Sequence, residues 1–175
     1  RICATVLLGP GSESKVHEAI TSVASAVDGF VLIESGGGYT ALAVARDAVG
    51  GAEHVSAHTD WTGSYSDARN VAIQLAERLE YDYAVTLDPD ERLGLPEQLR
   101  QILTLRPEVK VWSLRARDLG YCKERVLKCG VGLRWHGLVC ENVEEAQQVT
   151  LPGHFWELTK SPEGDRARWE RGIVA

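Results

Sequence analysis

Residues 83–91 read YAVTLDPDE, a run of strand-forming residues that ends abruptly in acidic residues and a proline. A short apolar run bounded by turn residues indicates a buried strand. Similar runs stand upstream at residues 2–8, 30–33 and 54–57. Apolar residues at helical spacing separate these runs, so the expected order is β-α-β-α-β-α-β. That order predicts an α/β fold with a mostly parallel central sheet and helices on both faces.

The helices between these strands are predicted by apolar residues spaced three and four positions apart. Ser12 can cap the first helix, and Ser66 or Asp67 can cap the third, because their side-chain oxygens accept hydrogen bonds from N–H groups of the first turn. Pro96 suits the first turn of a fourth helix. The predicted helices cover about residues 12–27, 40–49, 66–79 and 96–104.

The chain changes character after residue 109, where the helical alternation stops. Short strands separated by turns rich in glycine and charge are expected there. We therefore expect one domain over residues 1–160, with a regular half at 1–108 and a short-stranded half at 109–160. Residues 161–175 are expected to form a polar helix or tail. The short strands are predicted at residues 111–114, 126–127 and 138–139.

Length and composition exclude several classes of protein. A chain of 175 residues, 44% of them hydrophobic, can bury one core without disulfide or metal staples. Its net charge of −6 argues against general nucleic-acid binding, which needs a basic face. No apolar run is long enough to span a membrane, and no secretory signal opens the chain. The four cysteines lack paired C-x-x-C spacing, so reduced thiols and a cytoplasmic location are expected. The sequence does not indicate the oligomeric state.

Polar groups are expected to gather where the parallel strands end, because ligands of such sheets bind beyond the carboxyl ends of the strands. The turn at residues 9–11, Glu34 and the acidic loop each follow a predicted strand. Strand alternation would turn Asp88 and Asp90 the same way, and Pro89 stiffens the link between them. Paired carboxylates suit Mg²⁺ or Mn²⁺ shared with a diphosphate. The alternative without a ligand is that residues 88–90 form an ordinary surface loop and that Glu34 is a solvated turn residue.

Two segments together resemble the family 2 glycosyltransferases of the GT-A fold, in the subgroup with a D-x-D-E motif. In that family an ARN-x-A helix precedes a strand that ends in D-x-D-E. Here residues 66–72, SDARNVA, begin a predicted helix, and the next strand ends in DPDE at 88–91. Further segments that look like the family are FVLIESG at 30–36, KERVL at 123–127 and LRWHGLVCE at 133–141.

This resemblance covers about residues 2–145 and implies a GT-A, Rossmann-like α/β fold. It implies a metal-dependent enzyme that moves a sugar, with inversion, from a nucleoside diphosphate such as UDP to an acceptor that the sequence does not name. Residues 1–108 would bind the nucleotide, and 109–160 would face the acceptor. Asp88, Asp90 and His136 would hold Mg²⁺ or Mn²⁺, and Glu141, or alternatively Glu91, would be the catalytic base. The expected nucleotide-binding residues are Pro10, Glu34, Asp67, Arg69, Asn70, Asp88 and Trp135.

The chain also departs from the family at three places. The family's Lys-Asn-Glu after the first strand is replaced by residues 8–11, LGPG; Glu34 stands for an aspartate, and Cys140 for a histidine. Trp61 and Trp135 could stack on the ligand or simply pack. A nucleotidyltransferase remains an alternative, although its glycine-rich signature with arginine and lysine is absent. A second alternative is a non-catalytic domain that binds a sugar nucleotide or a partner.

Overall fold

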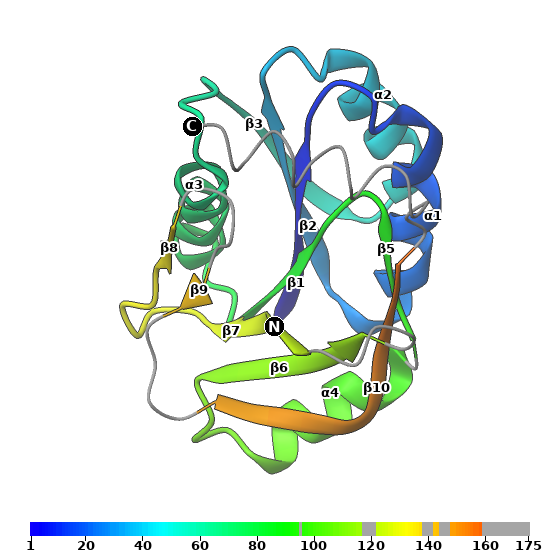
Figure 1. Ribbon diagram of the computed structural model, residues 1–175. Coiled ribbons are helices and arrows are strands. Elements are labelled where there is room, and N and C mark those ends of the chain that lie inside the picture. The colour runs from blue at the N-terminus through cyan, green and yellow to red at the C-terminus, as the bar shows by residue number, and fades with distance from the viewer. Residues whose placement is uncertain (95, 117–121, 138–141, 144–147, 159–175) are drawn as a thin grey trace.

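Four parallel strands form the first half of the central sheet in the computed structural model of the chain (Figure 1). They are β1 (Ile2–Leu8), β2 (Gly29–Ser35), β3 (Glu53–Thr59) and β4 (Tyr83–Leu87), in the order β3-β2-β1-β4. Strands β2 and β4 are buried at every position, as expected for strands covered on both faces. The structure describes all residues except 95, 117–121, 138–141, 144–147 and 159–175.

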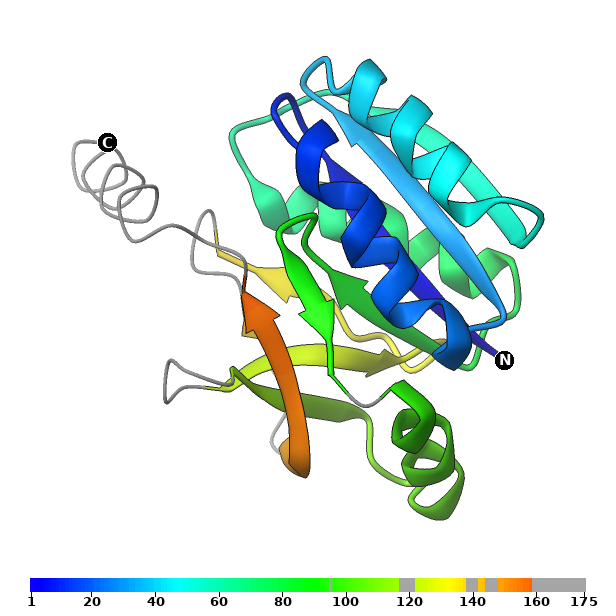
Figure 2. The same cartoon turned by 90° about the vertical axis from the view of Figure 1, so that its right-hand side faces the viewer.

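Helices cover the two faces of this half unequally. Figure 2 shows α1 (Glu13–Val23) and α2 (Tyr39–Val49) side by side on one face. There they pack on the even-numbered residues of β1. The opposite face, which includes Cys3, is covered by α3 (Tyr65–Arg78). The alternation of strand side chains therefore builds one apolar core on each side of the sheet.

The remaining strands extend the sheet beyond β4. They are β5 (Glu91–Leu93), β6 (Val111–Ala116), β7 (Cys122–Lys128) and β10 (Gln148–Leu158), and the order continues β4-β7-β6-β10-β5. Strand β7 is antiparallel to both β4 and β6, whereas β10 is parallel to β6 and antiparallel to β5. The connecting segments include a short 3₁₀ helix η1 (Ala24–Ala26), α4 (Pro96–Leu105), and a separate two-stranded sheet of β8 (Trp135–His136) and β9 (Asn142–Val143).

The predicted fold class is confirmed: a Rossmann-like α/β fold with helices on both faces of the sheet. The second half was expected to have short strands, but β6, β7 and β10 have 6, 7 and 11 residues. Strands β1 and β4 have the predicted bounds. Strands β5 and β10 were not expected. The strand predicted at residues 138–139 and the tail predicted at 161–175 lie outside the described residues. Among the described helices, none is long and apolar enough to cross a membrane.

The cap of α3 differs from the prediction. Ser64, not Ser66 or Asp67, caps the helix: its Oγ accepts a hydrogen bond from the Asp67 N–H at 3.2 Å. Ser64 has an extended backbone (φ −122°, ψ 120°), from which a serine side chain can reach the first turn. Ser12 is the cap residue of α1, but its backbone is helical (φ −82°, ψ −11°) and its side chain makes no capping bond.

Candidate active site

A pocket of about 460 Å³ lies at the carboxyl ends of the parallel strands. Its wall follows the sheet order: Trp61 comes after β3, Ser35 and Gly36 end β2, the turn at residues 9–12 follows β1, and residues 88–90 follow β4. Parallel strands end at a common edge, so these loops stand in a row along it. Leu7, Lys15 and Tyr65 complete the lining.

The pocket faces the side of the sheet that α3 covers. Leu7 packs with the apolar core beneath α3, and Ser35 lies two residues beyond Ile33, which belongs to the same core. Side chains two apart on a strand share a face. From the end of β4, Asp88 points to this side too, since Arg69 of α3 donates to its Oδ1 at 2.8 Å. Strand alternation thus brings groups from three strands into one pocket.

The loops after β1 and β2 touch at Gly38. A Cβ atom at Gly38 would lie 2.6 Å from the carbonyl oxygen of Leu8 and 2.9 Å from the carbonyl carbon of Gly9. Those separations are below van der Waals contact, so no side chain fits there. The turn of residues 9–12 is therefore held against the end of β2, and this contact fixes one wall of the pocket.

Glu34 is turned away from the pocket and is fully buried. Its Oε1 accepts a hydrogen bond from the Gly37 N–H at 2.8 Å, and its Oε2 pairs with His58 Nδ1. Gly36 and Gly37 have positive φ angles (68° and 91°), which lets the turn wrap around the carboxylate. This placement differs from the expectation that Glu34 faces a nucleoside.

His58 joins Glu34 to the end of β3, where it is the register partner of Glu34. The His58 Nε2 atom lies 3.4 Å from Asp60 Oδ1. The Tyr39 ring is stacked on the His58 ring, with the two ring centroids 6.1 Å apart. The hydrogen bond to Glu34, with a further contribution from Asp60, raises the pKa of His58. His58 thus cross-links the ends of β2 and β3 beside the pocket.

Asp88 and Asp90 both line the pocket, as predicted, but a turn rather than strand alternation brings them there. The Glu91 N–H donates to the Asp88 carbonyl oxygen at 2.9 Å and closes a β-turn with Pro89 in its second position. The Asp88 carboxylate is 20% exposed and bridges two guanidinium groups. Arg69 lies 2.8 Å from its Oδ1, and Arg125 lies 3.1 Å from its Oδ2.

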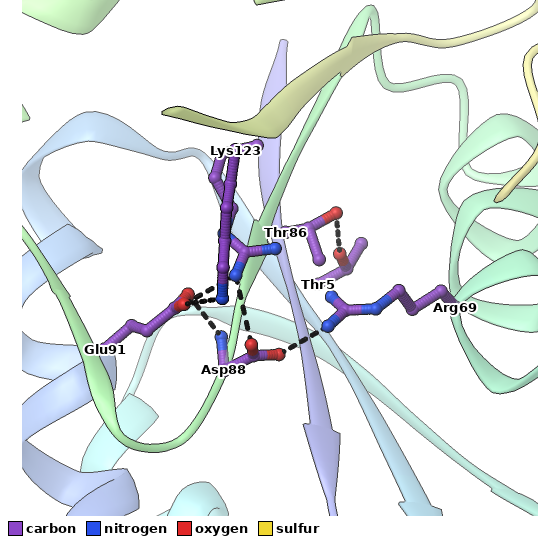
Figure 3. A network of polar contacts seen from close by, with 7 residues as sticks. Thr5, Arg69, Thr86, Asp88, Glu91 and Lys123 are labelled. Atoms are coloured by element: carbon purple, nitrogen blue, oxygen red, sulfur yellow. Dashed lines mark hydrogen bonds and ion pairs between the residues drawn. The ribbon is translucent and has the colours of Figure 1, made fainter. Parts of the chain in front are cut away.

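The Glu91 side chain points toward Asp88 and Lys123, as Figure 3 shows, and does not line the pocket. Its fully buried carboxylate is 2.5 Å from Arg125 Nη2 and 3.3 Å from Lys123 Nζ, and it accepts from the Asp88 N–H at 3.3 Å. A buried charge needs such partners to offset its lost hydration. In this position Glu91 stabilises the acidic turn. The sequence had instead suggested Glu91 as an alternative catalytic base that faces an acceptor.

The ARN segment of α3 mainly joins this helix to β8. Asn70 exchanges two hydrogen bonds with the backbone of Trp135, at 3.0 and 2.8 Å. The Arg69 guanidinium lies 5.1 Å from the centroid of the Trp135 ring, a cation–π contact. Asp67 accepts a hydrogen bond from Thr62 Oγ1 at 2.7 Å. None of these groups lines the pocket; of the nucleotide-binding residues expected from the sequence, only Pro10 and Asp88 do.

The other predicted site residues are dispersed. His136 is exposed on β8 and does not line the pocket. Glu141 lies outside the described residues. The lining residues that the sequence did not mark as site residues include Lys15, Ser35 and Tyr65. Lys15 carries a usable signal, because a lysine in the first turn of a helix after a glycine-rich turn is well placed for an anionic ligand. The other two have no comparable signature.

The acidic turn fits a divalent ion that is shared with a phosphate ligand. Within the described residues, no group of three or more His, Cys, Asp or Glu side chains could hold a metal by itself. Mg²⁺, however, is commonly bound by one or two carboxylates and completed by phosphate and water oxygens. Asp90 and Asp88 supply that donor set. A carboxylate has about four acceptor sites, so pairing with arginine does not by itself prevent Asp88 from binding a metal ion.

Comparison with known proteins shows a shared fold at low sequence identity. No protein-family model matches the chain, and no curated protein matches it in sequence. The structure of S. aureus TarS is similar with a TM-score of 0.64 and 12% identity over 95% of this chain and 38% of TarS. TarS 1-349 in complex with UDP gives 0.55 and 17% identity over 67% of this chain and 36% of that one.

A second similar structure is Rv0371c of Mycobacterium tuberculosis H37Rv, with a TM-score of 0.51 and 19% identity over 74% of this chain and 72% of that one. TarS 1-349 has also been solved with UDP-GlcNAc, and Rv0371c with manganese. The present chain spans little more than a third of each of these two TarS chains, 36% of TarS 1-349 and 38% of TarS. At these identities the likeness establishes the fold.

Proposed function

We propose that this chain is the core of a metal-dependent glycosyltransferase that moves a sugar from a nucleoside diphosphate to an acceptor. One observation carries the proposal: a single pocket at the carboxyl ends of parallel strands has the acidic turn of β4 at one end and Trp61 after β3 at the other. Carboxylates suit a metal-bound diphosphate, and an aromatic ring suits a base.

The size of the pocket agrees with this ligand class. Three strand spacings of about 4.8 Å separate β3 from β4, which makes the row of loops about 14 Å long. An extended nucleoside diphosphate has a comparable length. The volume of about 460 Å³ also falls within the usual range for small-molecule sites. One ligand can therefore touch both ends of the row.

The charges around the pocket suit a departing diphosphate. Asp90 and Asp88 would hold the metal, and that metal would neutralise the negative charge that develops on the leaving nucleoside diphosphate. Lys15, in the first turn of α1, adds a cation to the same wall. Arg69 and Arg125 pair with the two oxygens of the Asp88 carboxylate and fix its orientation.

The catalytic base is assigned to Glu141 on the sequence resemblance alone. A carboxylate within hydrogen-bond reach of an acceptor hydroxyl can remove its proton as the sugar is transferred. Direct attack by that hydroxyl from the face opposite the leaving group inverts the anomeric centre. The family assignment to glycosyltransferase family 2 and the inverting course belong to this proposal, as does a UDP-linked donor, which the TarS complexes with UDP and UDP-GlcNAc support.

Calorimetric titration of UDP-GlcNAc with and without Mn²⁺ tests the binding part of the proposal. We expect binding that Mn²⁺ strengthens, and we expect Asp90→Asn to abolish that dependence on the metal while the protein stays folded. Asp47→Asn is the matched control, because Asp47 is exposed on α2 and does not line the pocket. Unchanged metal dependence in Asp90→Asn would show that the metal assignment is wrong.

Release of free UDP from UDP-GlcNAc tests catalysis separately. An active enzyme releases the nucleoside diphosphate, whereas a non-catalytic binding domain only holds the sugar nucleotide. Glu141→Gln should bind the donor normally yet turn over at least about a hundredfold more slowly, since general bases contribute about 10²- to 10⁴-fold. Near-normal turnover of this variant would remove Glu141 from the role of base.

A further inference from the structure

We propose that the nucleobase of the donor is bound by Trp61 and Ser35 and that Glu34, at the end of β2, does not contact it. The inference rests on the proposed function and specifies how one end of its pocket selects a ligand. It starts from the fact that two neighbouring residues, Glu34 and Ser35, end the same strand but point to opposite faces of the sheet.

Ser35 presents an unused hydrogen-bonding group to the pocket. The residue is only 4% exposed and lines the pocket, and its Oγ has no hydrogen-bond partner among the described residues. A buried hydroxyl without a partner costs free energy, so a ligand that pairs with it gains affinity. A serine hydroxyl both donates and accepts, and can therefore match a carbonyl or an N–H on the edge of a base.

Trp61 provides an exposed aromatic surface beside that hydroxyl. Its side chain is 45% exposed and lines the pocket, an unusual state for a residue of this size. The Tyr65 ring meets it edge-on, with centroids 4.8 Å apart and planes at 67°, which limits its tilt. Its Cβ packs over Gly36, where an added Cβ atom would lie 3.5 Å from it. A held aromatic ring at a pocket wall is suited to stack on a base.

Glu34 has no part in this contact because its carboxylate is committed elsewhere. Both oxygens are occupied, one by the Gly37 N–H and one by His58, and the side chain is buried on the face away from α3. Contact with a ligand would require the carboxylate to leave the turn that wraps it. The base is therefore recognised by the next residue along β2, Ser35, whose side chain faces the pocket.

Calorimetry with two probes separates the base from the diphosphate. The probes are UDP and pyrophosphate, each with Mn²⁺, since pyrophosphate occupies the acidic end without a base. Trp61→Ala should weaken UDP binding by about 5- to 150-fold, the range that stacking contributes per base, and leave pyrophosphate binding unchanged. Trp61→Phe should restore much of the UDP affinity. Tyr39→Ala, which removes an exposed aromatic residue outside the pocket, should bind both probes as the wild type does.

Ser35→Ala should weaken UDP binding and leave pyrophosphate binding unchanged, because the hydroxyl is proposed to pair with the edge of the base, which pyrophosphate lacks. Unchanged UDP binding by Trp61→Ala would overturn the inference and leave the proposed function standing. An equal loss of UDP and pyrophosphate would also overturn it, since the whole pocket would then depend on Trp61. Failure of the wild type to bind either probe would instead contradict the proposed function itself.

Discussion

The parallel half of the sheet and its antiparallel extension depend on different kinds of information in the chain. In the parallel half, β1, β2 and β4 are almost continuous apolar runs, each paired with strands that the βα order brings beside it. In the extension, β5 has only three residues and pairs with β10 at the far end of the described chain. The first half is specified locally, and the second by long-range pairing.

The same contrast appears in the candidate site. Asp88 and Asp90 lie within three residues of each other at the end of a parallel strand. The cations that hold their turn come from elsewhere: Arg125 from β7 of the extension, and Arg69 from α3. The extension therefore does more than enlarge the sheet. It supplies buried charge that positions the acidic turn of the other half.

The largest effect is expected from breaking that long-range contact. Arg125→Met leaves the fully buried Glu91 without its closest cation, and removal of one partner from a buried ion pair costs about 3–5 kcal/mol. Urea unfolding measures the loss. The control is Arg106→Met, which removes an exposed pair with Glu108 and should cost at most about 1 kcal/mol. Similar small losses in both variants would show that the extension does not hold the turn.

A smaller effect is expected where two loops of the parallel half meet. Gly38→Ala places a methyl group 2.6 Å from the Leu8 carbonyl oxygen, and overpacking of this kind costs about 1–3 kcal/mol. The variant should also bind UDP more weakly, because the displaced turn forms a pocket wall. Gly51→Ala has open space around its new Cβ and should be neutral or gain up to about 1 kcal/mol. Equal stability of the two variants would contradict the close approach.

Two serines at helix starts test how locally the parallel half is specified. Ser64→Ala removes the capping bond of α3 and should lower the free energy of unfolding by about 1 kcal/mol. Ser12→Ala should have almost no effect, since that side chain makes no capping bond. Thermal unfolding of both variants provides the measurement. An equal loss in both would mean that the side-chain bond of Ser64 contributes nothing.

The smallest effect concerns pH at the β2–β3 edge. The partnership with Glu34 raises the pKa of folded His58, so its stabilisation is complete below the ordinary histidine pKa of about 6.5 and is lost as pH rises through the raised value. The Tm advantage of wild type over His58→Gln should thus be larger at pH 6 than at pH 9. His54→Gln controls for loss of an exposed histidine on the same strand. A pH-independent advantage would show that His58 acts without its charge.

Local patterns predicted most of the first half, and their failures elsewhere have physical causes. The bounds of β1 and β4 follow from uninterrupted apolar runs. Strand β10 was not predicted because its sequence contains Pro152 and Gly153, which are typical of a turn. Its pairing with β6 also shifts register between Thr150 and Phe155. Strand β5 is too short to have a period of its own.

The sequence alone determined the alternation of strands and helices along the chain, and with it the edge of the sheet where Pro10, Asp88 and Asp90 line a pocket. It could do so because apolar periodicity and chain order are local properties. Only the tertiary structure decided which way each polar side chain turns. Glu34 points inward because His58 of the neighbouring strand and the Gly37 N–H occupy its carboxylate. A carboxylate adopts the direction in which its charge is paired, and those partners are assembled only by folding.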